Sequence, residues 1–152
     1  MKKNGFLGIG CINMKNELNY GTLFRTAQQF NVDYIYLIGR RFKKMSSDTG
    51  CSYRHIPLFE YESFEDFYIH KPYGCELIGV ELNEKAHLIY NFVHPKQACY
   101  LLGAEDWGIP NDVLKKCQHI IQLPGEKSLN VSVAGSIVLY DRILKLEQKI
   151  NK

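Results

Sequence analysis

Short apolar runs alternate with longer segments of helical period along most of this chain. This alternation is typical of an α/β fold, in which a mostly parallel sheet is flanked by helices. Strands are predicted over residues 6–11, 34–38, 55–59, 77–82, 97–102 and 120–123. Helices are predicted over residues 21–30, 63–68, 110–116 and 131–149. The strand at 55–59 should lie at a sheet edge, because Pro57 cannot donate a ladder hydrogen bond.

The size and composition of the chain fit one globular domain over residues 1–152, which buries about two-thirds of its unfolded surface. No apolar run approaches the ~18 residues of a membrane span, and the first residues lack the core of a signal peptide. The five cysteines are widely spaced without a C-x-x-C pair, and the five histidines are scattered. We therefore expect a cytoplasmic protein with reduced thiols, no metal and no membrane partner.

The last predicted helix is amphipathic. Its core-facing positions are expected to be Ala134, Ile137, Val138, Leu144 and Ile150. The side chains expected to face water are Asp141, Arg142, Lys145 and Glu147.

Basic residues cluster in the predicted loop at 39–53, although the formal net charge of the whole chain is only +3. Arg40, Arg41, Lys43 and Lys44 are nearly contiguous there. A local cluster of this kind attracts phosphate more strongly than the mean charge does. The alternative, that the cluster is a solvated loop without a ligand, stays open.

Two glycines near the start of the chain, Gly8 and Gly10, suggest a dinucleotide-binding loop. The third glycine of that fingerprint is missing, and both glycines lie inside the first predicted strand rather than after it. We therefore interpret them as packing glycines of a buried strand.

Three segments rich in Gly and polar residues, at 19–26, 101–108 and 128–135, each lie where a hydrophobic element meets a turn. Backbone N–H and C=O groups are available for ligands at such junctions, because they lack partners in the adjoining helix or strand. Three junctions in so short a chain predict one composite site.

These segments resemble the three motifs of the SpoU family of RNA 2′-O-ribose methyltransferases, in the SPOUT superfamily. The first motif is similar to Asn19-x-Gly21-x-x-x-Arg25-Thr26-Ala27, the second to 102–110, and the third to 121–124 with 128–132. Thr22 and the pair Asp106-Trp107 depart from the usual pattern. The resemblance implies an α/β fold with a C-terminal deep trefoil knot, S-adenosyl-L-methionine as cofactor, RNA as substrate, with tRNA favoured, and a homodimer that completes the site. The large apolar face of the last helix is compatible with a partner subunit.

The resemblance also implies roles for individual residues. Catalytic roles are expected for Arg25, Asn19, Glu105, Ser128 and Asn130. The cofactor is expected to contact Val80, Glu81, Leu82, Gly103, Glu105, Ile121, Leu123, Ser128, Leu129 and Ser132. RNA is expected to contact Arg25, Arg40, Arg41, Lys43, Lys44 and Arg54.

Elementary chemistry refines some of these roles. A guanidinium resists deprotonation, so Arg25 is expected to position the RNA and stabilise charge, with Asn19 orienting it. Val80, Leu123 and Leu129 are candidates to sandwich an adenine, and Gly103 to let the backbone approach the ligand. Ser132 is expected to cap the last helix.

Aromatic and imidazole side chains are further candidates for RNA contact. Tyr53 is a candidate to stack on an unpaired base, and His55 is a candidate RNA contact. Trp107 is either a platform for an RNA base or a plug at a dimer interface.

Two other functions remain open at this stage. One is an RNA-binding module that keeps the fold without catalysis, and the other is an ordinary nucleotide-binding α/β enzyme. Methyl transfer to RNA distinguishes the methyltransferase from the RNA-binding module. Binding of nucleotides in preference to S-adenosyl-L-methionine would identify the nucleotide-binding enzyme.

Overall fold

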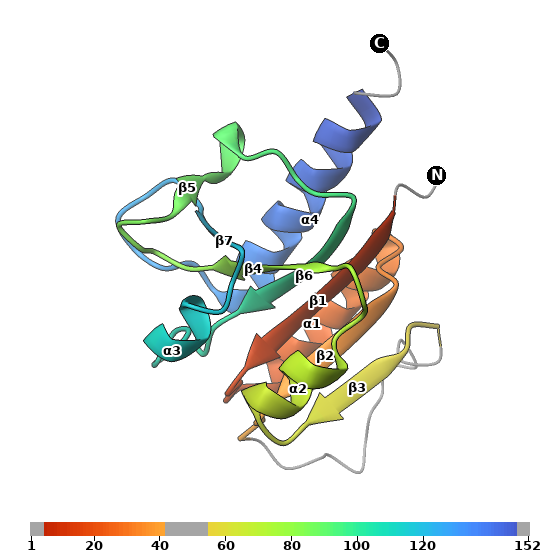
Figure 1. Ribbon diagram of the computed structural model, residues 1–152, viewed down its shortest axis with the longest axis vertical. Coiled ribbons are helices and arrows are strands. Elements are labelled where there is room, and N and C mark those ends of the chain that lie inside the picture. The colour runs from red at the N-terminus through yellow and green to blue at the C-terminus, as the bar shows by residue number, and fades with distance from the viewer. Residues whose placement is uncertain (1–4, 42–54, 149–152) are drawn as a thin grey trace.

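A computed structural model of the chain describes residues 5–41 and 55–148. The strands are β1 (Phe6–Ile12), β2 (Tyr34–Ile38), β3 (Leu58–Tyr61), β4 (Glu76–Val80), β5 (His87–Leu88), β6 (Gln97–Leu102) and β7 (His119–Gln122). Within the described residues these seven strands form one sheet in the order β3-β2-β1-β6-β4-β7-β5, and all neighbouring strands are parallel (Figure 1). The predicted α/β class is confirmed.

Helices cover both faces of the sheet. They are α1 (Glu17–Gln29), α2 (Phe64–His70), α3 (Asn111–Leu114), α4 (Val131–Gln148) and the short 3-10 turn η2 (Ile89–Asn91). α1 and α4 pack side by side on one face, and α2 and α3 lie on the other (Figure 1). Neighbouring side chains of a strand divide between the two cores, since Tyr100 and Leu102 join the α1/α4 side and Leu101 joins the α2/α3 side.

The two glycines of β1 make room for tyrosine rings on the α2/α3 side. A Cβ at Gly8 would lie 2.3 Å from the ring of Tyr34, and one at Gly10 would lie 2.2 Å from the ring of Tyr36. Tyr36 in turn donates a hydrogen bond to the carbonyl of Tyr100 at 2.5 Å. Gly8 and Gly10 are therefore packing glycines, as the sequence predicted.

α1 begins four residues earlier than predicted because Asn16 caps it. The Asn16 side chain accepts a hydrogen bond from the backbone N–H of Leu18 at 2.9 Å. The difference matters for the site, since Asn19 now lies in the first turn of a helix instead of in the turn before it. Leu23 and Ala27 are buried in the core.

Other boundaries differ for identifiable reasons. β3 lies at the predicted sheet edge but begins after Pro57, and α3 spans only four residues with Pro110 in the cap position. α2 is capped by Ser63, which accepts from the N–H of Asp66 at 3.1 Å. The two-residue strand β5 is too short to give a periodic signal and was not predicted. None of the helices in the described ranges is long and apolar enough to cross a membrane.

The buried and exposed side chains of α4 differ in part from the prediction. Ala134 and Val138 are buried, as expected, but Ile137 and Leu144 are exposed. Arg142 was predicted to face water and is only 2% exposed, because its guanidinium donates hydrogen bonds to the carbonyls of Pro95 and Lys96. Ile150 lies outside the described residues.

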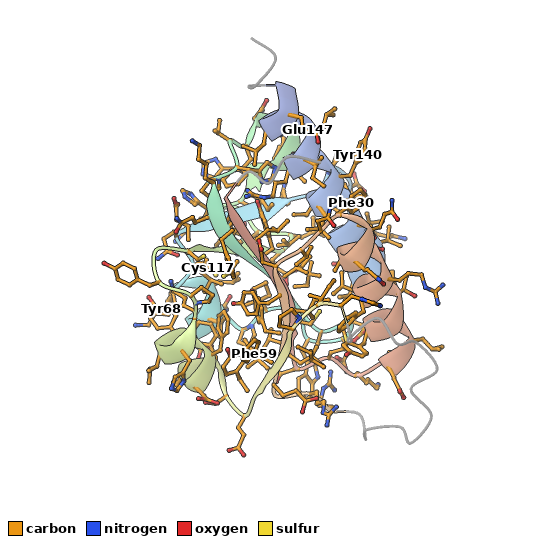
Figure 2. All side chains as sticks on the ribbon, turned by 90° about the vertical axis from the view of Figure 1, so that its right-hand side faces the viewer. Phe30, Phe59, Tyr68, Cys117, Tyr140 and Glu147 are labelled. Atoms are coloured by element: carbon orange, nitrogen blue, oxygen red, sulfur yellow. The ribbon has the colours of Figure 1, made fainter. Side chains whose placement is uncertain are left out.

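α4 also makes an aromatic contact with the end of α1. Phe30, which follows α1, lies with its ring centroid 6.4 Å from that of Tyr140 on α4 (Figure 2).

A buried polar network fastens α4 to the segment that precedes β6. His94 contacts the Tyr100 hydroxyl through Nδ1 at 2.6 Å and Asp141 through Nε2 at 2.8 Å. Asp141 also pairs with Lys145 at 2.7 Å. Because a carboxylate only accepts, Nε2 carries the proton and Nδ1 accepts from Tyr100, which is the neutral imidazole. Burial lowers the pKa of His94 to about 4, against the opposing effect of Asp141.

Candidate active site

A cavity opens where the loops that follow β4, β6 and β7 meet. Its volume is about 420 Å³, within the range of small-molecule sites. Carboxyl ends of parallel strands converge at this edge of the sheet, which is where α/β folds bind ligands. The lining comes from 80–83, 102–109, Asn111, Leu114, Leu123, 127–129, Val131 and Ala134.

Most of the residues expected to bind the cofactor line this cavity. The lining residues among them are Val80, Glu81, Leu82, Gly103, Glu105, Leu123, Ser128 and Leu129. Ile121 and Ser132 do not line it. Ile121 is fully buried within β7, where strand alternation turns it into the α1/α4 core, and Ser132 is buried inside the first turn of α4.

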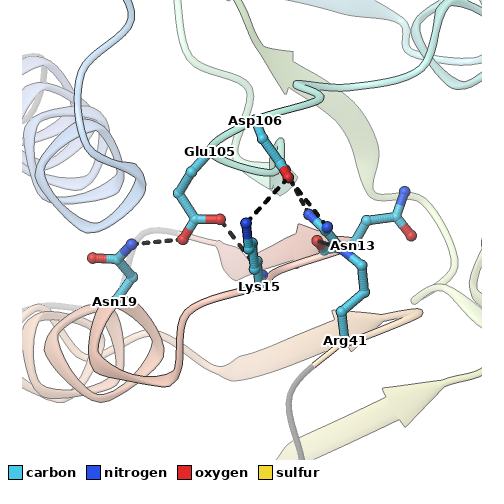
Figure 3. Close-up of polar contacts among 6 residues, drawn as sticks. All are labelled: Asn13, Lys15, Asn19, Arg41, Glu105 and Asp106. Carbon is cyan, nitrogen blue, oxygen red and sulfur yellow. Dashed lines mark hydrogen bonds and ion pairs between the residues drawn. The ribbon is translucent and has the colours of Figure 1, made fainter.

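Hydrogen bonds join the three motif segments beside the cavity. The amide Nδ2 of Asn19 donates to Glu105 Oε1 at 2.6 Å (Figure 3). The amide Nδ2 of Asn130 donates to Asn19 Oδ1 at 2.7 Å. Because Glu105 only accepts, it fixes which end of each amide faces which partner. Asn19, on α1 and 9% exposed, is thus the joint between the loop after β6 and the start of α4.

Asn130 also caps α4, in the place that the sequence assigned to Ser132. Its Oδ1 accepts from the backbone N–H of Ser132 at 3.0 Å and of Val133 at 3.4 Å. The Ser132 hydroxyl donates to the same oxygen at 2.6 Å. The helix begins at Val131, so the residue immediately before it is the one that can reach the free N–H groups.

Glu81 holds the loop after β6 in shape from the end of β4. Its carboxylate accepts from the N–H of Ile109 at 2.8 Å and from the N–H of Leu82 at 3.1 Å. A Cβ at Gly103 would lie 2.4 Å from the carbonyl carbon of Gly108. The missing side chain of Gly103 therefore makes room for the loop's own backbone. Gly103 also lines the cavity, and its close approach to the ligand stays a prediction.

An arginine clasp, formed by Arg41 on Asp106 and Trp107, lies beside the cavity that these two residues help to line. The terminal nitrogens of Arg41 donate to Asp106 at 2.6 and 3.2 Å, and Nε donates to the carbonyl of Asn13 at 2.9 Å (Figure 3). The guanidinium carbon lies 3.8 Å from the centre of the Trp107 ring. The hydrogen bonds between Arg41 and Asp106 lower the pKa of Asp106 and raise the pKa of Arg41, so both groups are charged.

Lys15 adds a second cation on the same side. Its ammonium lies 3.8 Å from Asp106, and its backbone N–H donates to Glu105 at 3.5 Å (Figure 3). Sequence reasoning missed Asn13, Lys15 and the pairing role of Asp106. No local pattern marks residues that meet only because β1, β2 and β6 end at the same edge of the sheet.

The expected RNA contacts are spread over the surface. Arg25 is exposed on α1 and is not part of the cavity lining. Arg40 pairs with Glu60 at 2.9 Å, and Arg41 belongs to the clasp. His55 is exposed, at the start of the second described range. Lys43, Lys44, Tyr53 and Arg54 lie outside the described residues.

Thiols and metal ligands do not form a site in the described ranges. Burial raises the pKa of Cys99 to about 12 and of Cys117 to about 11, which leaves both as neutral thiols. No group of three His, Cys, Asp or Glu side chains suited to a metal ion occurs in the described part of the chain.

Two relatives illustrate the sequence similarity. A protein of Archaeoglobus fulgidus named as an uncharacterized tRNA/rRNA methyltransferase is 28% identical over 137 residues, which are 84% of this chain and 60% of that protein. The tRNA (guanosine(18)-2′-O)-methyltransferase of Escherichia coli strain K12 is 26% identical over 129 residues, which are 81% of this chain and 56% of that protein. The chain thus spans less than two-thirds of the length of these relatives.

Solved structures share the fold. An AdoMet-bound rRNA methyltransferase from Sinorhizobium meliloti has a TM-score of 0.84 at 22% identity, over 94% of this chain and 57% of that chain. A structure solved for insight into the 2-OH methylation of C/U34 on tRNA has a TM-score of 0.84 at 22% identity, over 95% of this chain and 99% of that chain. The SpoU rRNA Methylase family model matches residues 7–140, from β1 to the middle of α4. The chain therefore belongs to the SpoU rRNA Methylase family.

Proposed function

We propose that this protein is an S-adenosyl-L-methionine-dependent RNA 2′-O-ribose methyltransferase that acts on tRNA. The observation that carries the proposal is the hydrogen-bonded chain Asn130–Asn19–Glu105 beside the cavity, because it joins all three motif segments at one place. The Escherichia coli relative is named for 2′-O-methylation of tRNA, and a structural neighbour of nearly equal length concerns 2-OH methylation of tRNA. Both names support the ribose hydroxyl and tRNA as targets.

The cavity fits a cofactor that combines an aromatic base with a charged tail. Apolar side chains of Val80, Leu123 and Leu129 contribute to its wall, next to loop backbone that can bond the edge of a base. When bound, S-adenosyl-L-methionine supplies an electrophilic methyl group. The chain's own contribution is to exclude water and to hold the ribose in line, and positioning of this kind lowers a barrier by ~7–11 kcal/mol.

We assign Arg25 a positioning and electrostatic role at the RNA backbone. Guanidinium groups keep their proton at physiological pH, and they bind phosphate oxygens with good geometry. Arg25 is exposed on α1, next to Thr26, whose hydroxyl accepts from Ser136 of α4 at 3.1 Å. An exposed arginine on the α1/α4 surface suits a site that is completed by a second subunit.

A homodimer is part of the proposal, and α4 supports it. Val133, Ile137, Tyr140 and Leu144 follow one another at helical spacing and are 38% to 58% exposed. Such a stripe marks an interaction surface more often than a solvated face.

We expect Ile137→Glu to shift the protein from dimer to monomer in sedimentation equilibrium, whereas Glu147→Gln on the same helix should leave the dimer intact. A parent protein that sediments as a monomer would refute the dimer.

We also propose that the C-terminal segment forms the deep trefoil knot implied by the family resemblance. β7 lies between β4 and β5 although it follows β6 in the chain. The chain thus returns into the part of the sheet that β4 and β5 delimit, and the loop that follows β7 lines the same cavity as the loops after β4 and β6. Both features are what a threaded segment requires.

Reduced thiols at Cys11, Cys75, Cys99 and Cys117 support a cytoplasmic protein.

The central experiment is methyl transfer from labelled S-adenosyl-L-methionine to unmodified total tRNA. The parent should transfer methyl groups, and Arg25→Ala should lower the rate by at least about 100-fold, since it removes charged contacts at the reacting group. The free energy of unfolding should change by less than ~0.5 kcal/mol, because the side chain is exposed. Arg25→Lys is the control that keeps the charge without the planar fork.

The product should be identified by mass spectrometry of nucleosides. In tRNA from cells that lack this protein, one 2′-O-methyl position should be missing. RNA binding by the parent without any methyl transfer would instead identify a non-catalytic RNA-binding module. Binding of adenine nucleotides without binding of S-adenosyl-L-methionine would identify an ordinary nucleotide-binding enzyme.

A further inference from the structure

Arg41 is held beside the cavity by several partners. Nε donates to the carbonyl of Asn13, both terminal nitrogens donate to Asp106, and the guanidinium carbon lies 3.8 Å from the centre of the Trp107 ring. Its charge is opposed by a carboxylate in bidentate geometry, which is the strongest arrangement for such a pair. Three of the five N–H donors of Arg41 are already used by these partners, and Asp106 offsets its charge, so Arg41 has little left to offer an RNA phosphate. This guanidinium is therefore poorly placed to bind a phosphate and well placed to present a flat surface.

Trp107 remains open to the outside despite this contact. Its side chain is 64% exposed, in a turn whose backbone is fixed by Glu81 and by the bridge between Ala104 and Gly108. An indole held in a rigid turn is a good stacking partner because little side-chain freedom is lost when a ring settles on it. Asp106 and Trp107 also line the cavity, so whatever stacks here lies beside the proposed methyl donor.

We infer that Trp107 and Arg41 together form a stacking platform for an unpaired base in the loop of a stem-loop RNA. Asp106 is a positioning residue that holds Arg41 over the ring. The inference rests on the proposed function, and it moves Arg41 from phosphate contact to base contact. Arginine planes and aromatic rings are the groups on which single-stranded bases stack, and stacking tolerates any base sequence.

The test uses two RNAs that differ only in their loop bases. One is an unmodified tRNA anticodon stem-loop, and the other is the same hairpin with abasic loop nucleotides, which keeps every phosphate. Affinities are measured without S-adenosyl-L-methionine, so that cofactor contacts do not contribute. The parent should bind the intact loop on the order of tenfold more tightly than the abasic loop. Trp107→Leu should reduce this ratio to about one, and Trp107→Phe should restore part of it.

Fluorescence gives an independent measurement, since Trp107 is the single tryptophan of the chain. The intact loop should quench its emission, and the abasic loop should not. Asp106→Asn keeps the indole but frees Arg41 from its carboxylate. This variant should lower the intact-to-abasic ratio, and it should make the slope of log K against log salt more negative by about 0.7–0.9, because one more phosphate is neutralised.

Each result decides between the platform and its rivals. Equal affinity of the parent for the two hairpins, or Arg41→Ala with a salt slope shallower by one phosphate, would overturn the inference in favour of a phosphate site. Dissociation of a dimer by Trp107→Leu would overturn it in favour of an interface plug. If one of these results is obtained and the parent still methylates tRNA, the stacking platform is rejected and the proposed function is kept. If the parent binds neither tRNA nor the hairpin, both proposals fail.

Discussion

Asn19, in the helix after β1, hydrogen-bonds to both other motif segments, to Glu105 and to Asn130. Asn19→Asp is nearly isosteric, but it replaces the donor that faces Glu105 with an oxygen. Two carboxylates at that distance repel each other, and the pKa of the pair must rise. We expect the variant to lose ~2–4 kcal/mol of unfolding free energy at pH 8. Relative to the parent, it should recover as the pH falls toward 5.

Urea unfolding at a series of pH values measures this effect. Asn19→Ala is the matched control, because it removes the same hydrogen bonds without adding a charge, so its difference from the parent should not depend on pH. Identical pH profiles for the two variants would show that Asn19 and Glu105 are not in contact.

Sequence reasoning at the residue scale found the members of the site better than their contacts. Asn19, Glu105 and Asn130 were placed in one site because each stands in a motif segment. That Asn19 binds the other two, rather than Arg25, depends on where α1 starts, and one capping side chain at Asn16 decides this. The pair Arg41–Asp106 joins residues 65 positions apart, and no spacing rule reaches that far.

Strand and helix predictions are accurate where burial is uniform along the element and inaccurate where it is not. The continuous apolar runs of β2 and β6 gave their exact bounds, since strands covered on both faces have no polar interruption. α4 was misread because its stripe at Ile137 and Leu144 was assigned to the core while Arg142 was assigned to water. Helical periodicity shows that two faces differ, but it does not tell which of them meets a partner.

Two glycines give opposite predictions for the elements that contain them. Gly10 lies in β1, where a Cβ would lie 2.2 Å from the ring of Tyr36 and 2.3 Å from its backbone oxygen. A backbone atom inside a sheet cannot move aside, so Gly10→Ala should lower the unfolding free energy by ~3 kcal/mol or more. Gly21 lies in α1 with nothing within 4 Å of the added atom, so Gly21→Ala should raise it by ~0.5–1 kcal/mol.

Calorimetric melting of the two variants beside the parent measures both effects. The added atom is the same, so hydrophobicity cannot explain a difference of sign. A Gly10→Ala variant that melts like the parent would contradict the close packing of β1 against β2, and a destabilised Gly21→Ala variant would contradict the open space at Gly21.

For the molecule as a whole, the buried network around His94 predicts sensitivity to acid. The pKa of His94 is about 4 in the folded chain and 6.5 without its environment, so the unfolded chain takes up the proton first. The stabilisation that the neutral imidazole of His94 provides is therefore complete above pH 6.5. It is lost as the pH falls toward 4, which lowers the unfolding free energy by on the order of 3 kcal/mol. Asp141, Lys145, Arg142 and Tyr100 surround the imidazole, so the charged form has no access to water.

The measurement is the unfolding free energy of parent and His94→Gln between pH 4 and pH 8. The variant should be less stable than the parent at pH 8, since it loses the bonds to Tyr100 and Asp141, but the two curves should converge in acid. Parallel curves would mean that His94 does not titrate in this range. Carboxylates remote from His94 titrate in both proteins and cancel in the difference.

The parallel pairing of β1 with β6 has a consequence for biosynthesis. Phe6 of β1 pairs with Gln97 of β6, which the ribosome adds about ninety residues later. At ordinary elongation rates, roughly 5–20 s pass before the edge of β1 that pairs with β6 has its partner strand. During that interval the unpaired edge of β1 can associate with other chains. We therefore expect holdase chaperones to bind the nascent chain.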